Sequence, residues 1–243
     1  MTDAVTTRDQ PLIAIDVVPM SFSATEGLRV ATARRPYDPY AGHQALPGVL
    51  LFPAERLADG AQRAMRTKAG IGSDSVRHLA QIGAFDGPGR DPRDAAISIA
   101  FVAVVDASGH PDATAIGPRT AKPATEPSEP RPPEAAPAAV WRDPAQAEPG
   151  LPFDHDRIIA AALEHARTRL WRDAALTRAL LGPRFTTADA ARLQTALTGT
   201  APDPGNLNRA LRTNAAILRS DDPAPSAAGR RGGRPPVTWT WRA

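Results

Sequence analysis

Charged side chains of both signs occur in residues 46–71, LPGVLLFPAERLADGAQRAMRTKAGI. Glu55 is followed by Arg63 and Lys68, and the apolar residues between them have helical spacing. Enzymes that cleave pyrophosphates usually need Mg²⁺, which is bound by several carboxylate oxygens. Glu55 by itself cannot hold such an ion and Lys68 would repel it, so this segment predicts anion binding by cationic side chains and no metal site.

Four further arginines in the first half of the chain have the chemistry to bind a pyrophosphate: Arg34, Arg35, Arg90 and Arg93. A guanidinium group donates two parallel hydrogen bonds to phosphate oxygens without the help of a metal. Lys68 is predicted to take over part of a cation's role, and Phe52 or Phe85 to stack on a base. The alternative is that these arginines are ordinary surface residues.

The C-terminal segment has residues suited to reading DNA. The sequence NLNRALR places Asn206, Arg209 and Arg212 on one side of a predicted helix, with Asn208 between them. Asparagine can pair with adenine and arginine with guanine in the major groove. The glycine-rich sequence GRRGGR adds a second basic group, predicted to contact phosphates, made up of Arg230, Arg231 and Arg234. The alternative is a basic loop of a structural domain.

Net charge divides the chain in the same way. Residues 168–243 contain twelve arginines, no lysine and five acids, a net charge of +7, whereas residues 1–167 carry −4. A basic C-terminal part predicts a polyanionic partner, and the alternative is a solvated basic face. With 243 residues and 42% hydrophobic residues, the chain is long enough for two folded domains.

Several classes of protein are excluded by composition and pattern. The longest apolar runs, such as AAISIAFVAVV, are shorter than the ~20 residues of a membrane helix, and no signal peptide is apparent. We therefore expect a cytoplasmic protein without membrane contact. Cysteine is absent, and the five histidines have no metal-ligand spacing, so no metal and no cofactor are predicted.

Hydrophobic patterns predict the elements that must position these residues. Strands are expected in residues 12–22, 28–35, 96–106 and 138–144, and helices in 54–70, ended by Gly70, and 153–170, capped by Asp154 or Asp156. Residues 107–139 contain eight prolines and are predicted to be an extended insertion in the first domain. After residue 185 we expect a helix capped by Thr186 or Thr187, a second helix started by a Pro-Gly turn, and a hairpin leading into a final strand.

Residues 46–71 resemble the Nudix box, with Leu46 to Gly48, Glu55, Arg63, Met65, Gly70 and Ile71 as matching positions and Val49 at a family glycine. Together with TARRP upstream, QIGAFDGPGRDPRDAAISIAFVAVV downstream and FDHDRIIAAALEHARTRL, this is similar to the Nudix-related transcriptional regulator (NrtR) family. The likeness covers nearly the whole chain outside the proline-rich insertion. The chain departs from the catalytic box at the three glutamates after Arg63, where it has Ala64, Thr67 and Lys68.

The resemblance implies an α/β (α+β) fold, with a Nudix-like mixed-sheet sandwich in residues 1–167 and a winged helix-turn-helix in residues 168–243. It implies a repressor that binds palindromic operator DNA as a homodimer, senses ADP-ribose or a related NAD metabolite, and controls genes of NAD metabolism. Such a protein would not be an enzyme. The alternatives are a Nudix-type nucleotide-sugar pyrophosphatase with unusual metal ligands, and an interaction scaffold that uses the proline-rich segment.

Overall fold

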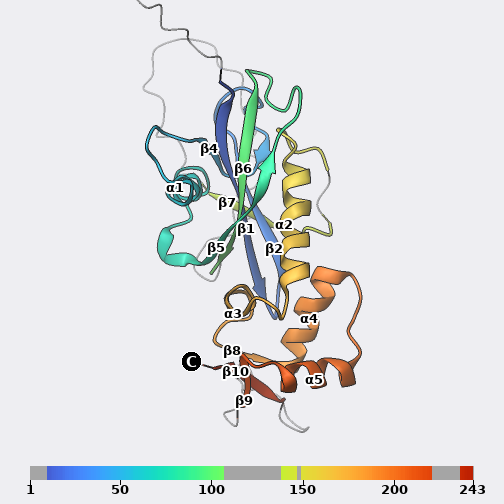
Figure 1. Cartoon of the computed structure of the whole chain (residues 1–243). Helices are drawn as coiled ribbons and strands as arrows, with labels where there is room; N and C mark the ends of the chain where they lie inside the picture. The colour runs from blue at the N-terminus through green and yellow to red at the C-terminus, as the bar shows by residue number, and fades with distance from the viewer. Residues whose placement is uncertain (1–9, 107–137, 147–148, 221–235, 243) are drawn as a thin grey trace, which may run out of the picture.

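The first part of the chain is built around a mixed β-sheet (Figure 1). The computed structural model describes residues 10–106, 138–146, 149–220 and 236–242. Its first sheet contains β1 (Leu12–Ser23), β2 (Gly27–Arg34), β3 (Gln44–Ala45), β4 (Gly48–Leu50), β5 (Val76–Phe85), β6 (Ala96–Val105) and β7 (Ala139–Arg142). The strand order is β3-β2-β1-β6-β5, with β4 on β1 and β7 on β2. β1 and β6 are parallel and the other pairs are antiparallel.

One helix covers each face of this sheet. α1 (Leu57–Ala69) packs its buried Ala61, Ala64 and Met65 against one face of β1 and β6. α2 (His155–Arg169) packs Ile158 and Ala162 against the other face. Because β1 and β6 are covered on both sides, they are continuous apolar runs and do not alternate with polar residues.

The four predicted strands and both predicted helices of this part are present. Gly70 ends α1 in the left-handed conformation, with φ of 67°, as predicted. The predicted side-chain cap of α2 is wrong. Asp154 holds the N-cap position without capping, and the Asp156 carboxylate instead accepts hydrogen bonds from the backbone N–H groups of Gly150 and Leu151.

The C-terminal part has the element order of a winged helix-turn-helix. It consists of α3 (Ala174–Leu181), β8 (Arg184–Thr186), α4 (Thr187–Thr198), α5 (Pro204–Thr213), β9 (Ile217–Ser220) and β10 (Thr238–Trp241). The strands form an antiparallel sheet in the order β8-β10-β9. The fold expected from the sequence, a Nudix-like mixed sheet followed by a winged helix-turn-helix, is therefore confirmed.

Two helix starts in this part test the predicted caps. Thr186 caps α4 in a reciprocal capping box with Asp189, as predicted. The predicted Pro-Gly turn before α5 is wrong, because Pro204 and Gly205 form the first turn of the helix itself and Asp203 is the cap. The tip of the predicted hairpin lies in residues 221–235, outside the described residues.

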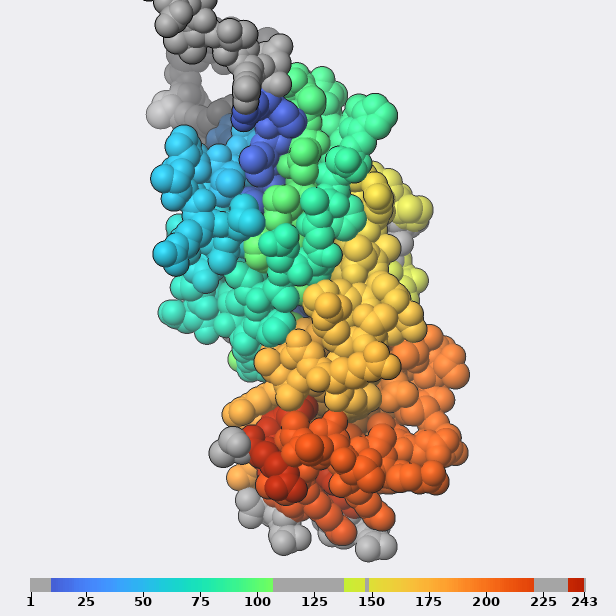
Figure 2. Space-filling model, in the orientation of Figure 1, coloured from blue at the N-terminus to red at the C-terminus, as the bar shows by residue number. Residues whose placement is uncertain are grey.

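The two parts share one hydrophobic core. A single cluster runs from the sheet through Ala166 of α2 and Leu170 just after it to Leu180, Leu193 and Trp239. α4 contacts α2 and β2, while α3 contacts β1, β5 and β6, so the winged helix lies against one end of the sheet (Figure 2). The predicted boundary between residues 167 and 168 falls in the last turn of α2 and stays a prediction. Within the described ranges, no helix is both long and apolar enough to cross a membrane.

Thr186→Ala is expected to destabilise the protein by about 0.5–2 kcal/mol, because it removes the cap of α4. Thr198→Ala is the matched control on the same helix, since its hydroxyl caps no N–H of the first turn and contacts only the backbone of Gln194 and Thr200 at the exposed end. Urea unfolding of the two variants measures the difference. Equal free energies of unfolding would contradict the role of the cap.

Candidate functional site

A cavity of about 370 Å³ opens where β1, β2 and β4 meet the start of α2. Its charged lining residues are Asp16, Arg34, Arg35, Asp38, Arg63, Lys68, Arg90, Asp91 and Arg93, and its aromatic ones are Tyr37, Phe52, Phe153 and His155. Six of the seven predicted effector-binding residues thus line one cavity, although their part in binding stays a prediction. Phe85 is not among them, because it is only 7% exposed and belongs to the hydrophobic core.

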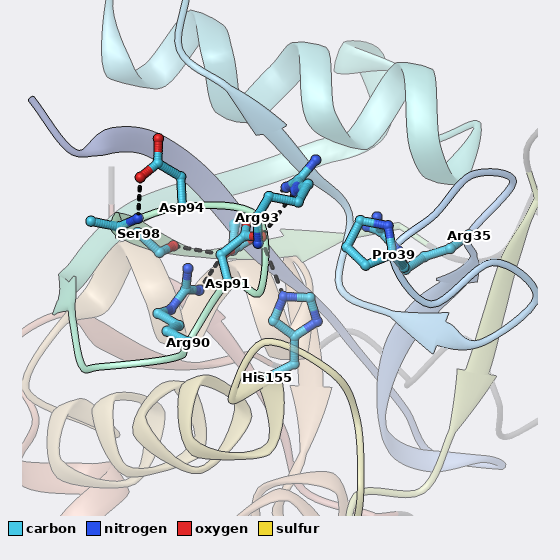
Figure 3. A network of polar contacts seen from close by, with 10 residues as sticks. Arg35, Pro39, Arg90, Asp91, Arg93, Asp94, Ser98 and His155 are labelled. Atoms are coloured by element: carbon cyan, nitrogen blue, oxygen red, sulfur yellow. Dashed lines mark hydrogen bonds and ion pairs between the residues drawn. The ribbon is translucent and has the colours of Figure 1, made fainter. Parts of the chain in front are cut away.

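The floor of the cavity is a buried carboxylate, Asp16, which lies on β1 and is 5% exposed. It accepts hydrogen bonds from Arg90 Nη2 at 2.8 Å and from the Ser98 hydroxyl at 2.6 Å. His155 Nε2 lies 3.6 Å from its other oxygen. Arg90, Ser98 and His155 come from three separate segments and point toward the same place (Figure 3). Asp16 therefore connects its own strand, β1, with three other segments: β6, the loop that precedes β6, and α2.

These contacts determine the ionisation of Asp16. Burial alone would raise its pKa, but the facing His155 ring, the Ser98 hydroxyl and the Arg90 guanidinium together lower the pKa well below its usual range. A carboxyl group whose pKa is lowered by folding stabilises the protein above its ordinary pKa, and this stabilisation is lost only in stronger acid. Asp16 is consequently a fixed negative charge throughout the physiological pH range.

His155 is a cavity residue that the sequence analysis missed, since FDHD suggested only capping or helix packing. Its Nδ1 accepts a hydrogen bond from the backbone N–H of Leu46 at 2.9 Å, which leaves Nε2–H to face Asp16. Phe153, also missed, lies under the Arg35 guanidinium at 4.6 Å from its ring centre. Both residues precede or begin an apolar helix, so local sequence gave no signal of the cavity.

Most of the predicted arginines already have partners in the protein. Arg90 also forms an ion pair with Asp154 at 2.8 Å, and Arg93 donates two hydrogen bonds to Asp91 at 2.9 and 2.6 Å. The hydrogen bonds to Asp91 raise the pKa of Arg93. Arg35 donates a hydrogen bond to the backbone oxygen of Pro39. Its burial, and to a smaller extent the nearby positive charge of Arg93, lower its pKa.

Two cations of the cavity differ from these arginines. Arg34 is exposed and Lys68 is partly exposed, and neither forms an ion pair with any residue that the structure describes. Their charges are not neutralised by a neighbouring carboxylate. They are therefore the groups most available to an anionic ligand.

Glu55 and Arg63, two of the positions that match the Nudix box in sequence, are bound to each other. Arg63 donates to both carboxylate oxygens of Glu55 at 2.7 Å, and the Phe52 backbone N–H donates to the same carboxylate at 2.9 Å. The hydrogen bonds from Arg63 lower the pKa of Glu55 to about 2. The Arg63 guanidinium also covers the Phe52 ring at 3.8 Å, while that side chain stays 57% exposed.

The Nudix fold implies a bound divalent cation, and the residues present do not fit one. At the three positions of the missing glutamates, Ala64 is fully buried, the Thr67 hydroxyl donates to the backbone oxygen of Arg63, and Lys68 brings a positive charge. No group of three histidine or acidic side chains within residues 10–106, 138–146, 149–220 and 236–242 could hold a metal. Lys68 would repel the cation.

α5 presents the residues predicted to read DNA. It buries Leu207 and Leu211 against α4 and β9, which leaves Asn206, Arg209 and Arg212 exposed on its outer face. Asn208 is partly buried, and its amide donates to the backbone oxygen of Pro204 at 2.8 Å, so it is less available than the sequence suggested. The predicted phosphate-contacting residues Arg230, Arg231 and Arg234 lie outside the described residues.

Solved structures of other proteins have the same fold as this chain. The chain is similar to NrtR from Shewanella oneidensis in complex with a 27mer DNA, with 16% identity, a TM-score of 0.66, and coverage of 95% of this chain and 93% of the other. The same protein without DNA gives 18% identity, a TM-score of 0.62, and coverage of 95% and 94%. No family model and no curated protein matches the sequence.

A third similar structure is a MutT/nudix family protein from Enterococcus faecalis, with 17% identity, a TM-score of 0.65, and coverage of 98% of this chain and 89% of the other. At these identities the likeness concerns the fold. The chain has the NrtR architecture over about 95% of its length, with a Nudix-like body and a C-terminal winged helix. The resemblance seen in the sequence is confirmed at that level.

Gly48→Ala is expected to destabilise the protein by about 1–3 kcal/mol, because a Cβ atom there would lie 2.2 Å from Asp16 Oδ1. The buried carboxylate cannot move away without losing Arg90 or Ser98. Gly72→Ala is the matched control, since its Cβ would meet nothing within 4 Å. Thermal and urea unfolding check both, and a Gly48→Ala protein as stable as Gly72→Ala would contradict the placement of Asp16.

Glu55 is expected to titrate near pH 2, as followed by the NMR signal of its side-chain carboxyl carbon. Its contribution to stability should be present above the ordinary value of 4.5 and be lost as the pH falls through about 2. Arg63→Gln should move the titration upward, while Arg66→Gln on the exposed side of the same helix should not. A wild-type midpoint near 4.5 would rule out the ion pair.

Proposed function

We propose that this protein is a transcriptional repressor in which a non-catalytic Nudix-like domain senses an anionic nucleotide sugar and a winged helix binds operator DNA. The observation that carries the proposal is the exposed face of α5. Asn206, Arg209 and Arg212 stand on the outer side of the second helix of a helix-turn-helix, which is the helix that enters the major groove. Arg230, Arg231 and Arg234, which lie outside the described residues, are proposed to contact phosphates.

The cavity supports a ligand with a pyrophosphate group. Arg34, Arg35 and Lys68 supply positive charge at its wall, while Phe52 offers an exposed ring on which a base can stack. ADP-ribose has both groups, and we propose it, or a related NAD metabolite, as the effector. Genes of NAD metabolism are then the proposed targets, following the family that the sequence resembles.

Hydrolysis of the ligand is disfavoured by the chemistry of the box. Pyrophosphate cleavage in Nudix enzymes depends on divalent cations, and Ala64, Thr67 and Lys68 cannot supply their carboxylate ligands. Both oxygens of the remaining Glu55 are occupied by Arg63. We therefore propose that the cavity binds the nucleotide sugar and leaves it intact.

The proposed DNA-binding species is a homodimer. A two-fold dimer reads an inverted repeat whose half-site centres are about one DNA turn apart, or a multiple of it. The Nudix-like part is proposed to carry the dimer contact. A palindromic operator is therefore proposed, and selection from random duplexes with the full-length protein would identify it.

Asn206→Ala and Arg209→Ala are expected to weaken binding to the selected operator by about 1–3 kcal/mol each and to change binding to random duplex little, because they remove base contacts. Arg234→Ala should weaken both duplexes alike and reduce the dependence on salt. Salt titrations of both duplexes by fluorescence anisotropy measure this. Arg66→Ala, an exposed arginine on α1, is the control and should change neither.

The same experiments can overturn the proposal. Full-length protein that binds no duplex above random affinity would refute the repressor. ADP-ribose is expected to bind in the presence of EDTA, measured by calorimetry, and to be recovered unchanged. Mg²⁺-dependent turnover in the ordinary enzymatic range of ~1–10³ s⁻¹ would instead establish the pyrophosphatase.

A further inference from the structure

The backbone that enters α2 is held in an unusual conformation. Phe153 and Asp154 both have positive φ, 59° and 55°, a region that side chains with a Cβ rarely adopt. Asp154 stands at the N-cap of α2, yet its side chain accepts no hydrogen bond from the helix. N-cap aspartates normally have extended φ and ψ and accept from the second or third N–H of the helix. Some other contact must therefore hold Asp154 in this state.

That contact is Arg90. The Asp154 Oδ1 atom lies 2.8 Å from Arg90 Nε, and the Arg90 side chain is only 4% exposed. Both atoms are buried, and neither makes a hydrogen bond with any part of the chain that the structure describes. The two groups attract each other by charge, but the N–H of Arg90 is not directed at the oxygen. An oxygen placed along this N–H would bind better than Asp154 does.

We propose that, without ligand, Asp154 pairs with the Arg90 guanidinium that the ligand would bind. A phosphate oxygen of the ligand then displaces the Asp154 carboxylate from Arg90 and so changes the start of α2. This inference rests on the proposed function, because it assigns the cavity an anionic effector. Arg90 is a lining residue of the cavity, so an anion in the cavity can approach it. Asp154 is then an internal competitor for the ligand.

Of the two carboxylates on Arg90, Asp154 is the one that gives way. The Asp16 side chain is 7% exposed and is also bound by Ser98 and His155. The Asp154 side chain is 26% exposed, and its other ionic partner is Arg157 at 3.9 Å, one turn along α2. Leaving Arg90 costs Asp154 one poorly aligned contact, whereas Asp16 would lose a hydrogen bond at the floor of the cavity.

A second state is available to the released Asp154. Once free of Arg90, its carboxylate can turn to the N–H groups of the first turn of α2 and cap the helix, with extended backbone angles at the N-cap. That change removes the positive φ of Asp154. The start of α2 thus has two arrangements, one paired with Arg90 and one capped, and the ligand favours the second.

α2 connects this change with the DNA-binding part. Its first residue, His155, lies in the cavity wall. Ala166 near its end, and Leu170 just after it, belong to the core shared with α3 and α4. A shift of a packed helix moves the elements that pack on it. The ligand therefore acts on the position of α4, which supports α5.

The test is to compare wild type with Asp154→Asn in the full-length protein, using ADP-ribose, inorganic pyrophosphate and the selected duplex as probes. Asparagine also tolerates positive φ, so the variant removes the charge and leaves the fold. Calorimetry should show that Asp154→Asn binds ADP-ribose and pyrophosphate at least about fivefold more tightly than wild type. In this variant, ADP-ribose should change the affinity for the duplex little or not at all. Asp154→Gly, which accepts the same φ without a carboxylate, should behave alike.

Glu164→Gln is the control, since it makes the same change of charge on the exposed side of α2, where Glu164 pairs with Arg167. It should leave both affinities and the coupling as in wild type. If Asp154→Asn and Asp154→Gly bind both anions with wild-type affinity and keep the wild-type coupling, the inference is overturned while the repressor stands. If wild type binds neither anion nor duplex, the proposed function itself fails.

Discussion

The Asp16–Arg90 ion pair is the interaction on which the cavity depends. An unpaired carboxylate buried this deeply would be very costly, so Asp16 needs the charge of Arg90 and the hydrogen bond of Ser98. These partners come from different segments, and satisfying one buried charge fixes all of them in space. The same carboxylate leaves no room for a side chain at Gly48. The glycine of the Leu-Pro-Gly sequence is thus explained by the carboxylate that faces it.

The residues that match the Nudix box have a structural role in this protein. Arg63 contacts Glu55, the Leu50 backbone oxygen and the Phe52 ring, so these side chains connect α1 to the loop before it without any metal. Lys68 stands where a hydrolase would have a carboxylate. A cavity built this way can hold an anion by permanent positive charge, and its binding would not require a divalent cation.

The shared core gives the two parts of the chain a mechanical connection. α2 packs on the sheet at its centre and on α3 and α4 at its end, within one hydrophobic cluster. The proposed change at the start of α2 would therefore reach the helices that support the helix-turn-helix. Two domains joined by a long linker would not have this property, because a flexible linker does not transmit a shift in position.

The sequence by itself determined the fold class, the main strands of the sheet, α1 and α2, and the capped α4. These elements depend on apolar periodicity and on caps, which are local properties. The sequence did not reveal β5, whose ten residues are mostly half-buried and whose pairing with β6 has two register shifts, so its pattern does not alternate cleanly. It also missed α3, an eight-residue helix.

Only the tertiary structure decided which charged residues act together. Asp16 and Arg90 are far apart in sequence, and His155 and Phe153 lie at the start of a helix whose apolar stripe suggested packing alone. Phe85 and Phe52 were equal candidates for stacking, yet one is in the core and the other is exposed. The physical reason is that burial, pairing and the conformation of Asp154 depend on contacts between distant segments, which periodicity does not encode.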